Sequence, residues 1–239
     1  RAAACNYSTI ILTVDNTVLG RRERDVRRGF TLPPKIGLDT IFDGLRHPSW
    51  TWDFITSEPI KFANLTESTV GDGSDPVSLA TYINTQLDPS LSWEDLAWLR
   101  DRWKGKLVIK GIQSVNDALL SVDYGVDAVA LSNHGGRQLD DAPAPIDLLP
   151  EVVAALGGQT EIIVDGGVRR GSDIVKAVAL GANACMVGRP YLYGLGAAGE
   201  VGVDFVIDHF ATGLERTLAL LGCPSVDELG PQYLSVNKH

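Results

Sequence analysis

Short runs of apolar and β-branched residues recur along the chain, and each ends in polar or glycine-rich residues that lead into a helical pattern. Continuous apolar runs of this kind are typical of strands in a parallel sheet whose two faces are both covered. The runs span residues 9–15, 107–111, 128–133, 161–167 and 184–189. The pattern therefore predicts an α/β fold with five parallel strands joined by helices.

The ends of the intervening helices are marked by capping residues. Ser114, and Ser172 with Asp173, precede helical runs, and their side-chain oxygens can cap free backbone N–H groups. Gly125 and Gly181 follow the helical runs, where a left-handed residue is favoured. We expect helices to begin after these caps and to end at these glycines.

Five strands do not close an eight-stranded barrel, so two architectures fit the pattern. One is an open doubly wound sheet, and the other is a (β/α)8 TIM barrel of which about the last five β/α units are present. The chain begins with Arg1 rather than Met and enters its first strand almost at once. With the motifs below, this favours residues 1–239 as the C-terminal portion of a single barrel domain.

A long insert separates the first two strands. Residues from about 30 to 92 are rich in Pro, Gly, Trp, Asp and Thr, and we expect them to be irregular. The segment Trp50–Ile55 concentrates aromatic side chains. It either packs locally onto the barrel or forms an exposed patch for a partner or a membrane surface.

Composition narrows the classes of function. The 239 residues are 44% hydrophobic and 21% charged, which is ordinary for a globular protein, and the net charge of -9 argues against nucleic-acid binding. Cys5, Cys185 and Cys223 are far apart and predict neither a disulfide framework nor a metal site. No apolar run reaches the roughly 18 to 20 residues that span a bilayer. We expect a cytoplasmic protein that is soluble or, at most, peripheral on the membrane.

The segment Ser132–Asp140 carries the strongest chemical signal, because it lies where an apolar strand ends. Catalytic groups of parallel barrels gather at that edge. His134 is a side chain suited to accept a proton near neutral pH, and Arg137 offers a forked donor for a carboxylate. A purely structural, hydrogen-bonded histidine is the alternative.

Two further strand ends carry charged side chains. Asp15 ends the first run and can orient the His134 imidazole, with Arg22 following it; a helix cap or a rim ion pair is the alternative. Lys110 lies within an apolar run, where an ammonium group is costly unless it meets an anion or a ligand. A lysine that extends from the strand end into water is the alternative there.

The last two strands end in glycine-arginine turns. Asp165-Gly166-Gly167-Val168-Arg169 follows one strand, and Gly188-Arg189 follows the next. Phosphate sites in parallel barrels form after strands seven and eight from backbone N–H groups, helix N-termini and arginine. The two turns therefore predict a phosphate site.

With these motifs together, the chain resembles the FMN-dependent α-hydroxy-acid dehydrogenase family, which includes glycolate oxidase, flavin-type L-lactate dehydrogenase and mandelate dehydrogenase. The resemblance runs almost end to end and extends to the actinobacterial lactate dehydrogenase and pre-mycofactocin synthase branches. Its most specific segments are Leu12–Asp15, Leu19–Asp25, Val108–Gly111, Ser132–Asp140, Asp165–Arg169 and Gly188–Arg189.

The resemblance implies roles for single residues. His134 would be the catalytic base, Asp15 its partner, and Arg137 and Arg22 the cations at the substrate carboxylate. Lys110 would lie beside the flavin ring. The remaining contacts to FMN would come from Thr13, Ser132, Asp165, Gly167, Arg169, Gly188 and Arg189.

The reaction implied is the oxidation of an L-2-hydroxy acid, L-lactate first, to the 2-oxo acid, with electrons passing through FMN to a quinone or another acceptor. Relatives tend to be homotetramers, so a homo-oligomer is expected. Mandelate, glycolate or a peptide-derived substrate is the alternative within the family. Asn16-Thr17 departs from the Thr-Pro that many relatives have after the aspartate. Outside this family, the alternatives are a different phosphate-binding barrel enzyme and a non-catalytic binding module.

Overall fold

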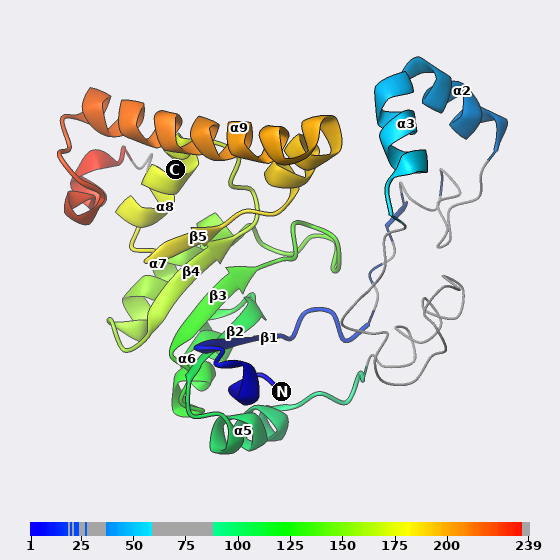
Figure 1. The fold of residues 1–239 in the computed structure, drawn as a ribbon. Helices are drawn as coiled ribbons and strands as arrows, with labels where there is room; N and C mark the ends of the chain where they lie inside the picture. The colour runs from blue at the N-terminus through cyan, green and yellow to red at the C-terminus, as the bar shows by residue number, and fades with distance from the viewer. Residues whose placement is uncertain (19, 21, 24–26, 28–36, 59–87, 236–239) are drawn as a thin grey trace. The chain divides into compact units, whose positions relative to one another are not determined.

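The computed structural model describes residues 1–18, 20, 22, 23, 27, 37–58 and 88–235. They belong to two compact units, one made of residues 1–20 and 90–239 and the other of residues 21–89. The first unit carries the sheet (Figure 1).

The sheet has five parallel strands in the order β1-β2-β3-β4-β5 (Figure 1). All five predicted strands are confirmed. A parallel sheet in strict chain order is the arrangement of a barrel wall, whereas a doubly wound sheet reverses its strand order at a switch point. The strands are β1 (Thr9–Thr13), β2 (Lys106–Ile112), β3 (Ala128–Ser132), β4 (Glu161–Asp165) and β5 (Ala184–Met186).

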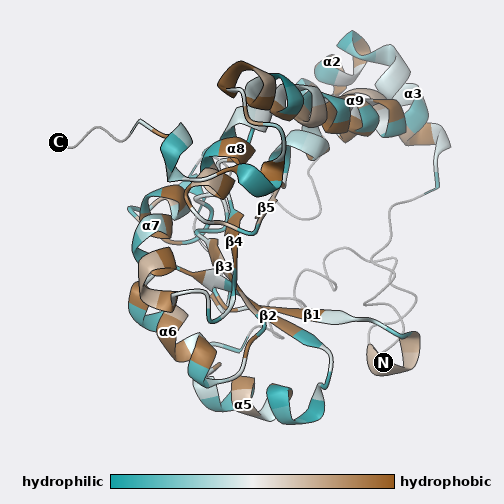
Figure 2. Ribbon diagram, turned by 90° about the vertical axis from the view of Figure 1, so that its left-hand side faces the viewer, coloured by the Kyte–Doolittle hydropathy of each residue, from teal (hydrophilic) through white to brown (hydrophobic). Residues whose placement is uncertain are grey.

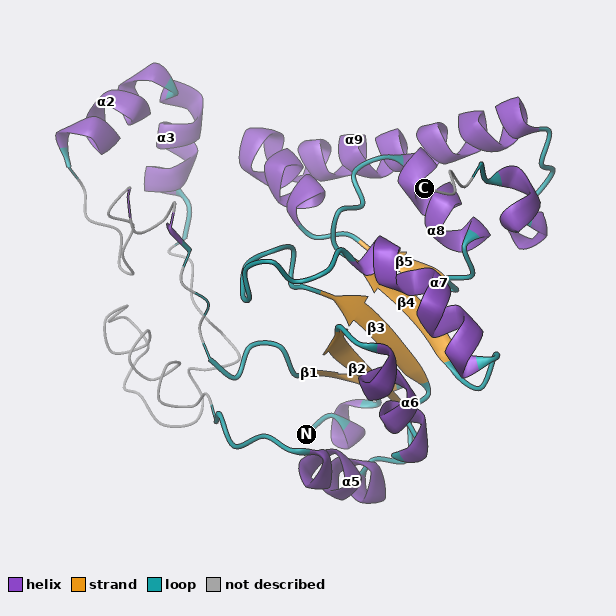
Figure 3. Ribbon diagram, turned by 180° about the vertical axis from the view of Figure 1, so that it is seen from behind, coloured by secondary structure: helices purple, strands orange, loops and turns teal. Residues whose placement is uncertain are grey.

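A layer of helices lies along one side of the curved sheet (Figures 2 and 3). They are α5 (Trp93–Arg102), α6 (Val115–Asp123), α7 (Pro145–Leu156) and α8 (Gly171–Ala179). The helical segment α9 (Arg189–Leu221), which is kinked at Ala198 and Gly199, packs against α8. Short 3-10 helices span Ala3–Cys5, Val226–Glu228 and Pro231–Tyr233. The covered side of the sheet corresponds to the outer face of a barrel wall, and the opposite side to its interior.

The two faces of the sheet carry different residues. Leu107, Ile109 and Val129 belong to the main core, which also contains residues of α5, α6 and α7. Val108 and Ala130 belong to a small second cluster, which also holds Ala128 and the partly buried Ile163. Because side chains alternate between faces along a strand, the next residues on the inner face, towards the carboxyl ends, are polar. They are Lys110, Ser132 and Asp165.

The predicted helix ends are largely confirmed. The hydroxyl of Ser114 accepts the backbone N–H of Asp117 at 3.1 Å, which caps α6. Gly125 and Gly181 have φ of +73° and +108°, in the left-handed region expected after a helix. The start of α8 differs from the prediction.

Helix α8 begins at Gly171, before the predicted cap at Ser172. The carboxylate of Asp173 reaches back and accepts the N–H groups of Arg169 and Arg170, each at 3.0 Å. An acidic side chain at the third helical position can satisfy donors that precede the helix, so Asp173 performs the capping from inside the first turn.

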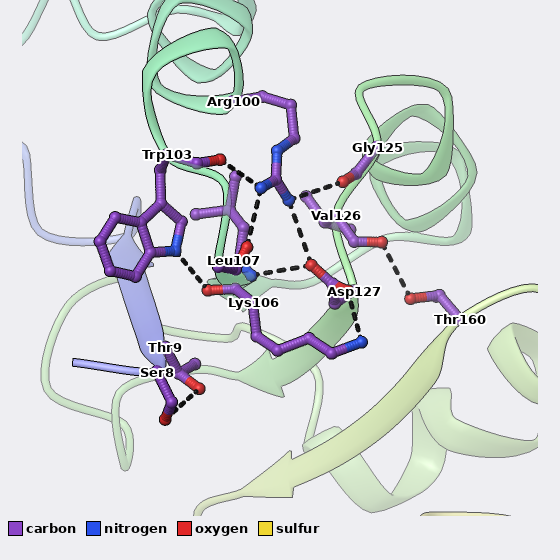
Figure 4. Close-up of polar contacts among 11 residues, drawn as sticks. Ser8, Thr9, Arg100, Trp103, Lys106, Leu107, Gly125, Val126, Asp127 and Thr160 are labelled. Carbon is purple, nitrogen blue, oxygen red and sulfur yellow. Dashed lines mark hydrogen bonds and ion pairs between the residues drawn. The ribbon is translucent and has the colours of Figure 1, made fainter. Parts of the chain in front are cut away.

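A polar cluster ties α5 to the start of β2 and to the residues just before β3, at the amino ends of the strands (Figure 4). The guanidinium of Arg100 donates to the carbonyl oxygens of Trp103, Gly105 and Gly125 and to the carboxylate of Asp127. These contacts satisfy backbone groups that a strand end leaves unpaired, so the cluster has a structural role.

Asp127 is the acidic centre of that cluster. Lys106 Nζ lies 2.8 Å from Asp127 Oδ1, and the N–H of Leu107 donates to Oδ2 at 2.9 Å. Partial burial disfavours the carboxylate, but the hydrogen bonds from Lys106 and Leu107 outweigh it and lower the pKa of Asp127. The same ion pair raises the pKa of Lys106.

Within the second unit, the structure describes two helices, α2 (Leu38–Arg46) and α3 (Pro48–Thr56) (Figure 1). The prediction of an irregular insert is wrong for these residues. The rings of Trp50 and Phe54 stack with centroids 5.2 Å apart. Apolar side chains of both helices are exposed, namely Leu38, Ile41, Phe42, Leu45, Trp50, Trp52, Phe54 and Ile55. None of the helices in the described ranges is long and apolar enough to cross a membrane.

Candidate active site

Asp15 and His134 meet at the carboxyl edge of the sheet. His134 Nδ1 lies 3.0 Å from Asp15 Oδ1, although 119 residues separate the two positions. The Asp15 side chain is only 2% exposed and that of His134 is 32% exposed. Because a carboxylate only accepts hydrogen bonds, this contact assigns the proton to Nδ1 and leaves Nε2 as a proton acceptor.

The backbone of His134 lies in the left-handed region, with φ of +54°. Gly135 and Gly136 continue it with φ of +66° and +69°. The hydroxyl of Ser132 accepts the N–H of His134 at 3.0 Å, and the side chain of Asn133 accepts the N–H of Gly136 at 3.2 Å. This turn ends β3 abruptly and holds the imidazole at the strand end.

Gly111 makes the approach of Asp15 to the sheet sterically possible. It lies at a register shift in β2, between Lys110 and Ile112, with φ of +109°. A Cβ atom at this position would lie 2.7 Å from Asp15 Cβ and 2.8 Å from its Cγ. This role was not predicted from the sequence, although a glycine inside a strand is a signal for a bulge or a close backbone approach.

Lys110 is held by a polar group from each of the next two strands. Its Nζ lies 2.9 Å from Asp165 Oδ2 and 3.2 Å from Ser132 Oγ. The side chains of Lys110 and Asp165 are 15% and 16% exposed. The Ser132 hydroxyl donates to Asp165 at 2.7 Å and also accepts the N–H of His134, so its hydrogen-bonding capacity is used within the chain. Thr13 lies opposite Lys110 in the β1–β2 register.

A cavity of about 450 Å³ opens between the loops after β3 and β4 and the first turns of α7 and α8. His134, Ser132 and Asp165 do not line it, but their sequence neighbours Asn133, Gly135 and Gly166 do. Gly135 and Gly136 line it from the loop after β3, and Gly166 and Gly167 from the loop after β4. The last two have φ of +106° and +79°. A Cβ at Gly167 would meet no atom within 4 Å, so nothing crowds the backbone there. The remaining lining residues are Asn133, Ala144, Pro145, Ile146, Val164, Val168, Arg169, Asp173, Lys176, Ala177 and Arg189.

The cations of this cavity fit a phosphate. Arg169 lines it from the loop after β4 and Arg189 from the first residue of α9, and α8 begins beside it. Arg189 also donates to the carbonyl oxygen of Gly135, which ties the start of α9 to the loop after β3. Exposed backbone N–H groups, a helix N-terminus and arginines together form an anion site. Lys176 adds a third cation, while the Asp173 carboxylate is bonded to backbone N–H groups.

The structure brings most of the predicted site residues to one edge of the sheet. Asp15 and His134 form a pair, and Lys110, Ser132 and Asp165 form a cluster. Thr13 ends β1, Gly167 and Arg169 lie in the loop after β4, and Gly188 and Arg189 lie at the start of α9. Arg137 lies in the loop that carries His134. Arg22 belongs to the other unit, so its place at the site stays a prediction, as do the individual roles of all these residues.

An imidazole–carboxylate pair beside an anion-binding cavity, at the carboxyl edge of a parallel β/α wall, is typical of barrel enzymes with a phosphate-bearing cofactor or substrate. Similarity to known proteins identifies the family within this class.

The profile of the FMN-dependent dehydrogenase family matches residues 1–236. The chain is 49% identical over 98% of its length to a putative L-lactate dehydrogenase of Mycobacterium tuberculosis. It is 44% identical over 98% of its length to the (S)-mandelate dehydrogenase of Pseudomonas putida. The crystal structure of a monotopic membrane protein, (S)-mandelate dehydrogenase, superposes with a TM-score of 0.90 at 44% identity and covers 98% of this chain and 61% of that one.

The chain belongs to the FMN-dependent dehydrogenase family, whose relatives include 2-hydroxy-acid dehydrogenases and oxidases. Its fold is accordingly that of a (β/α)8 barrel, of which the described residues form five strands. The chain spans 55% and 58% of the length of the two relatives named above.

Proposed function

We propose that the protein carrying this chain is an FMN-dependent oxidoreductase that converts an L-2-hydroxy acid to the 2-oxo acid. The observation that carries the proposal is the contact between Asp15 and His134 at the carboxyl edge of the sheet, where a cavity suited to a phosphate is lined by Gly135 and Gly136 of the same loop as His134. The similarity to a putative L-lactate dehydrogenase favours L-lactate as the substrate, and the similarity to an (S)-mandelate dehydrogenase makes mandelate the second candidate.

The residues of the chain fit FMN. Arg169 and Arg189, with the backbone of Gly166 and Gly167, would hold the phosphate end. Lys110 would lie beside the ring, with Asp165 and Ser132 keeping its ammonium group in position. When bound, FMN supplies the two-electron acceptor that no protein side chain provides.

His134 would remove the proton from the substrate. Its Nδ1 is bonded to Asp15, so Nε2 is the atom that takes the proton, and the carboxylate stabilises the resulting imidazolium. Arg137, three residues further along the same loop, would bind the substrate carboxylate through its guanidinium fork, with Arg22 as a second cation.

A flavin-reduction assay on the full-length protein tests the function. The purified protein is expected to be yellow and to bleach anaerobically with L-lactate, L-mandelate or glycolate. His134→Gln is expected to retain the flavin but to reduce it at least about 100-fold more slowly. His209→Gln is the matched control, because His209 lies exposed on α9. A protein that neither holds flavin nor regains it from added FMN would refute the proposal.

The proposed role of Arg137 in binding the substrate carboxylate has its own test. Arg137→Met is expected to raise the KM for every 2-hydroxy acid that the enzyme accepts, because the charged fork for the carboxylate is lost. Arg216→Met, on the exposed surface of α9, serves as control. Unchanged kinetics with Arg137→Met would favour a different phosphate-binding barrel enzyme.

We further propose that the protein works at the inner face of a membrane and passes its electrons to a quinone. Leu38, Ile41, Phe42 and Leu45 of α2 are 51 to 74% exposed and recur at helical spacing on one face. Such a face can lie in a bilayer interface. The monotopic membrane character of the (S)-mandelate dehydrogenase supports this location.

Flotation with phosphatidylcholine–phosphatidylglycerol vesicles tests the location. The wild-type protein is expected to float with the vesicles, and Phe42→Asp is expected to stay largely in the soluble fraction. Thr40→Asp introduces the same charge at a polar position of α2 and should float like the wild type. Equal flotation of all three, or of none, would contradict a membrane contact through α2.

The resemblance also implies a homo-oligomer, and we propose that the full-length protein forms a homotetramer. Helix α9 presents exposed apolar side chains, including Leu195, Val201 and Phe205, that a subunit contact would cover. Light scattering coupled to size exclusion would measure the mass of the assembly, and a monomer would contradict the proposal.

A further inference from the structure

The side-chain amide of Gln138 joins the loop after β1 to the loop after β3. Its Nε2 donates to the backbone carbonyl of Asp15 at 2.9 Å and more weakly to that of Val18 at 3.4 Å. Its Oε1 accepts the backbone N–H of Gly20 at 2.9 Å. One amide group therefore bonds both ends of the segment 15–20.

The two loops are packed too closely for any residue but glycine at position 20. A Cβ atom on Gly20 would lie 2.6 Å from both Gln138 Cα and Gln138 Oε1, and it would also collide with the carbonyl oxygen of Arg137. Two of these atoms are backbone atoms and cannot rotate away. The absence of a side chain at Gly20 thus lets the two loops come close enough for the Gln138 amide to reach its backbone partners.

These contacts hold the residue that pairs with the imidazole. The carboxylate of Asp15 is hydrogen-bonded to His134, and its backbone carbonyl accepts from Gln138. Gln138 lies four residues after His134 in the loop that follows β3. A residue anchored at both its side chain and its backbone cannot swing its carboxylate away without breaking one of the two bonds. The geometry of the Asp15–His134 pair therefore depends on an amide that touches neither reacting group.

We propose that Gln138 is a positioning residue for the active site, a latch that fixes the loop of Asp15 against the loop of His134. The proposal rests on the proposed function of His134 as the base. Its role is to keep Nε2 of the imidazole aimed at the substrate, since a displacement of about 1 Å in a catalytic group can cost on the order of 100-fold in rate. No signal in the sequence marks Gln138, because its partners are backbone groups about 120 residues away.

Three variants of the full-length protein test the latch. Gln138→Met keeps the length of the side chain and removes both hydrogen bonds. Gln138→Glu keeps the acceptor for Gly20 but places a carboxylate oxygen against the Asp15 carbonyl. Asp141→Asn is the control, because Asp141 is exposed in the same loop and has a left-handed backbone that asparagine tolerates.

Amide hydrogen exchange is the first measurement, since it needs neither flavin nor substrate. Gln138→Met should speed exchange in the peptide covering residues 9–20 by about tenfold or more, because a lost hydrogen bond lowers the cost of local opening. Gln138→Glu should retain protection at Gly20. Exchange in both variants equal to that of the wild type and of Asp141→Asn would overturn the latch.

Transient kinetics is the second measurement. Both Gln138 variants should lower the rate constant for flavin reduction by about tenfold or more while the dissociation constant of the substrate changes less than about threefold. Weaker substrate binding with an unchanged reduction rate would overturn a positioning role and make Gln138 a substrate contact. If no 2-hydroxy acid reduces the wild-type flavin, the proposed function fails, and hydrogen exchange still decides whether the latch exists.

Discussion

The imidazole of His134, which follows β3, and the carboxylate of Asp15, which follows β1, meet across the intervening strand β2. Gly111 of β2 lies against Asp15 and leaves room for its side chain. Asp15 Oδ2, the second carboxylate oxygen, is buried without a hydrogen-bond partner in the part of the chain that the structure describes. The negative charge of Asp15 is thus directed mainly at one nitrogen, which suits a carboxylate that stabilises an imidazolium.

Asp15→Asn should slow flavin reduction by at least about 100-fold with little change in flavin content. An amide can donate to Nδ1 and thereby move the ring proton to Nε2, where it blocks proton abstraction. Stopped-flow reduction with L-lactate measures the effect. Asp204→Asn, at an exposed position of α9, is the control and should reduce its flavin like the wild type. A loss of less than about threefold would separate Asp15 from catalysis.

Gly111→Ala should lose more stability and activity than the left-handed backbone alone explains. The new methyl group would overlap Asp15 Cβ and Cγ, so the carboxylate has to shift. Gly157→Ala is the control, because Gly157 also has a positive φ, of +57°, but no atom within 4 Å of the added Cβ. We expect a loss of about 1 kcal/mol in urea unfolding for Gly157→Ala, and of about 2 to 4 kcal/mol for Gly111→Ala. Equal losses would contradict the steric role.

Lys110 and Asp165 should be strongly coupled. Lys110→Met leaves the largely buried Asp165 carboxylate without its cation and should cost about 3 kcal/mol or more in urea unfolding of the flavin-free protein. The double variant Lys110→Met/Asp165→Asn should recover much of that loss. The coupling energy of the double-mutant cycle measures the pair, and a value near zero would show that solvent screens it.

The cluster around Asp127 predicts a pH dependence of stability at both extremes. The pKa of Asp127 is lowered, so its contribution is present near neutral pH and is lost as the pH falls below about 4. The pKa of Lys106 is raised, so its small contribution persists through pH 10 and is lost as the pH rises further. Asp127→Asn should cost about 1 kcal/mol at pH 7 and flatten the decline towards pH 3.

Urea unfolding at pH 3, 5 and 7 measures this dependence. Glu151→Gln is the control, since Glu151 is an exposed carboxylate on α7. If the free energy of unfolding of Asp127→Asn falls towards pH 3 as steeply as that of the wild type, carboxylates other than Asp127 cause the acid loss of stability.

The strands were predictable because a parallel sheet covered on both faces leaves continuous apolar runs in the sequence. The polar residues that end those runs were equally visible, and the structure pairs Asp15 with His134 and Lys110 with Asp165. Parallel strands bring their carboxyl ends to one edge, so strand-end residues meet without further information.

The contacts that align these residues were not predictable in the same way. Gln138 bonds backbone atoms of residues 15–20, and backbone partners leave no mark in the sequence. Helix α2 was missed for another reason. Its apolar residues recur at helical spacing from Leu38 to Leu45, but the glycines and prolines around them outweighed that signal.

The positive φ of His134 limits how the base can be probed. An L-alanine there removes the imidazole and also carries the energetic penalty of a left-handed backbone, so its kinetic defect mixes lost chemistry with a distorted turn. Asparagine adopts this conformation readily and cannot act as a base near neutral pH. Comparing His134→Asn with His134→Ala would therefore measure how much of the enzyme's rate belongs to the ring and how much to the shape of the main chain beneath it.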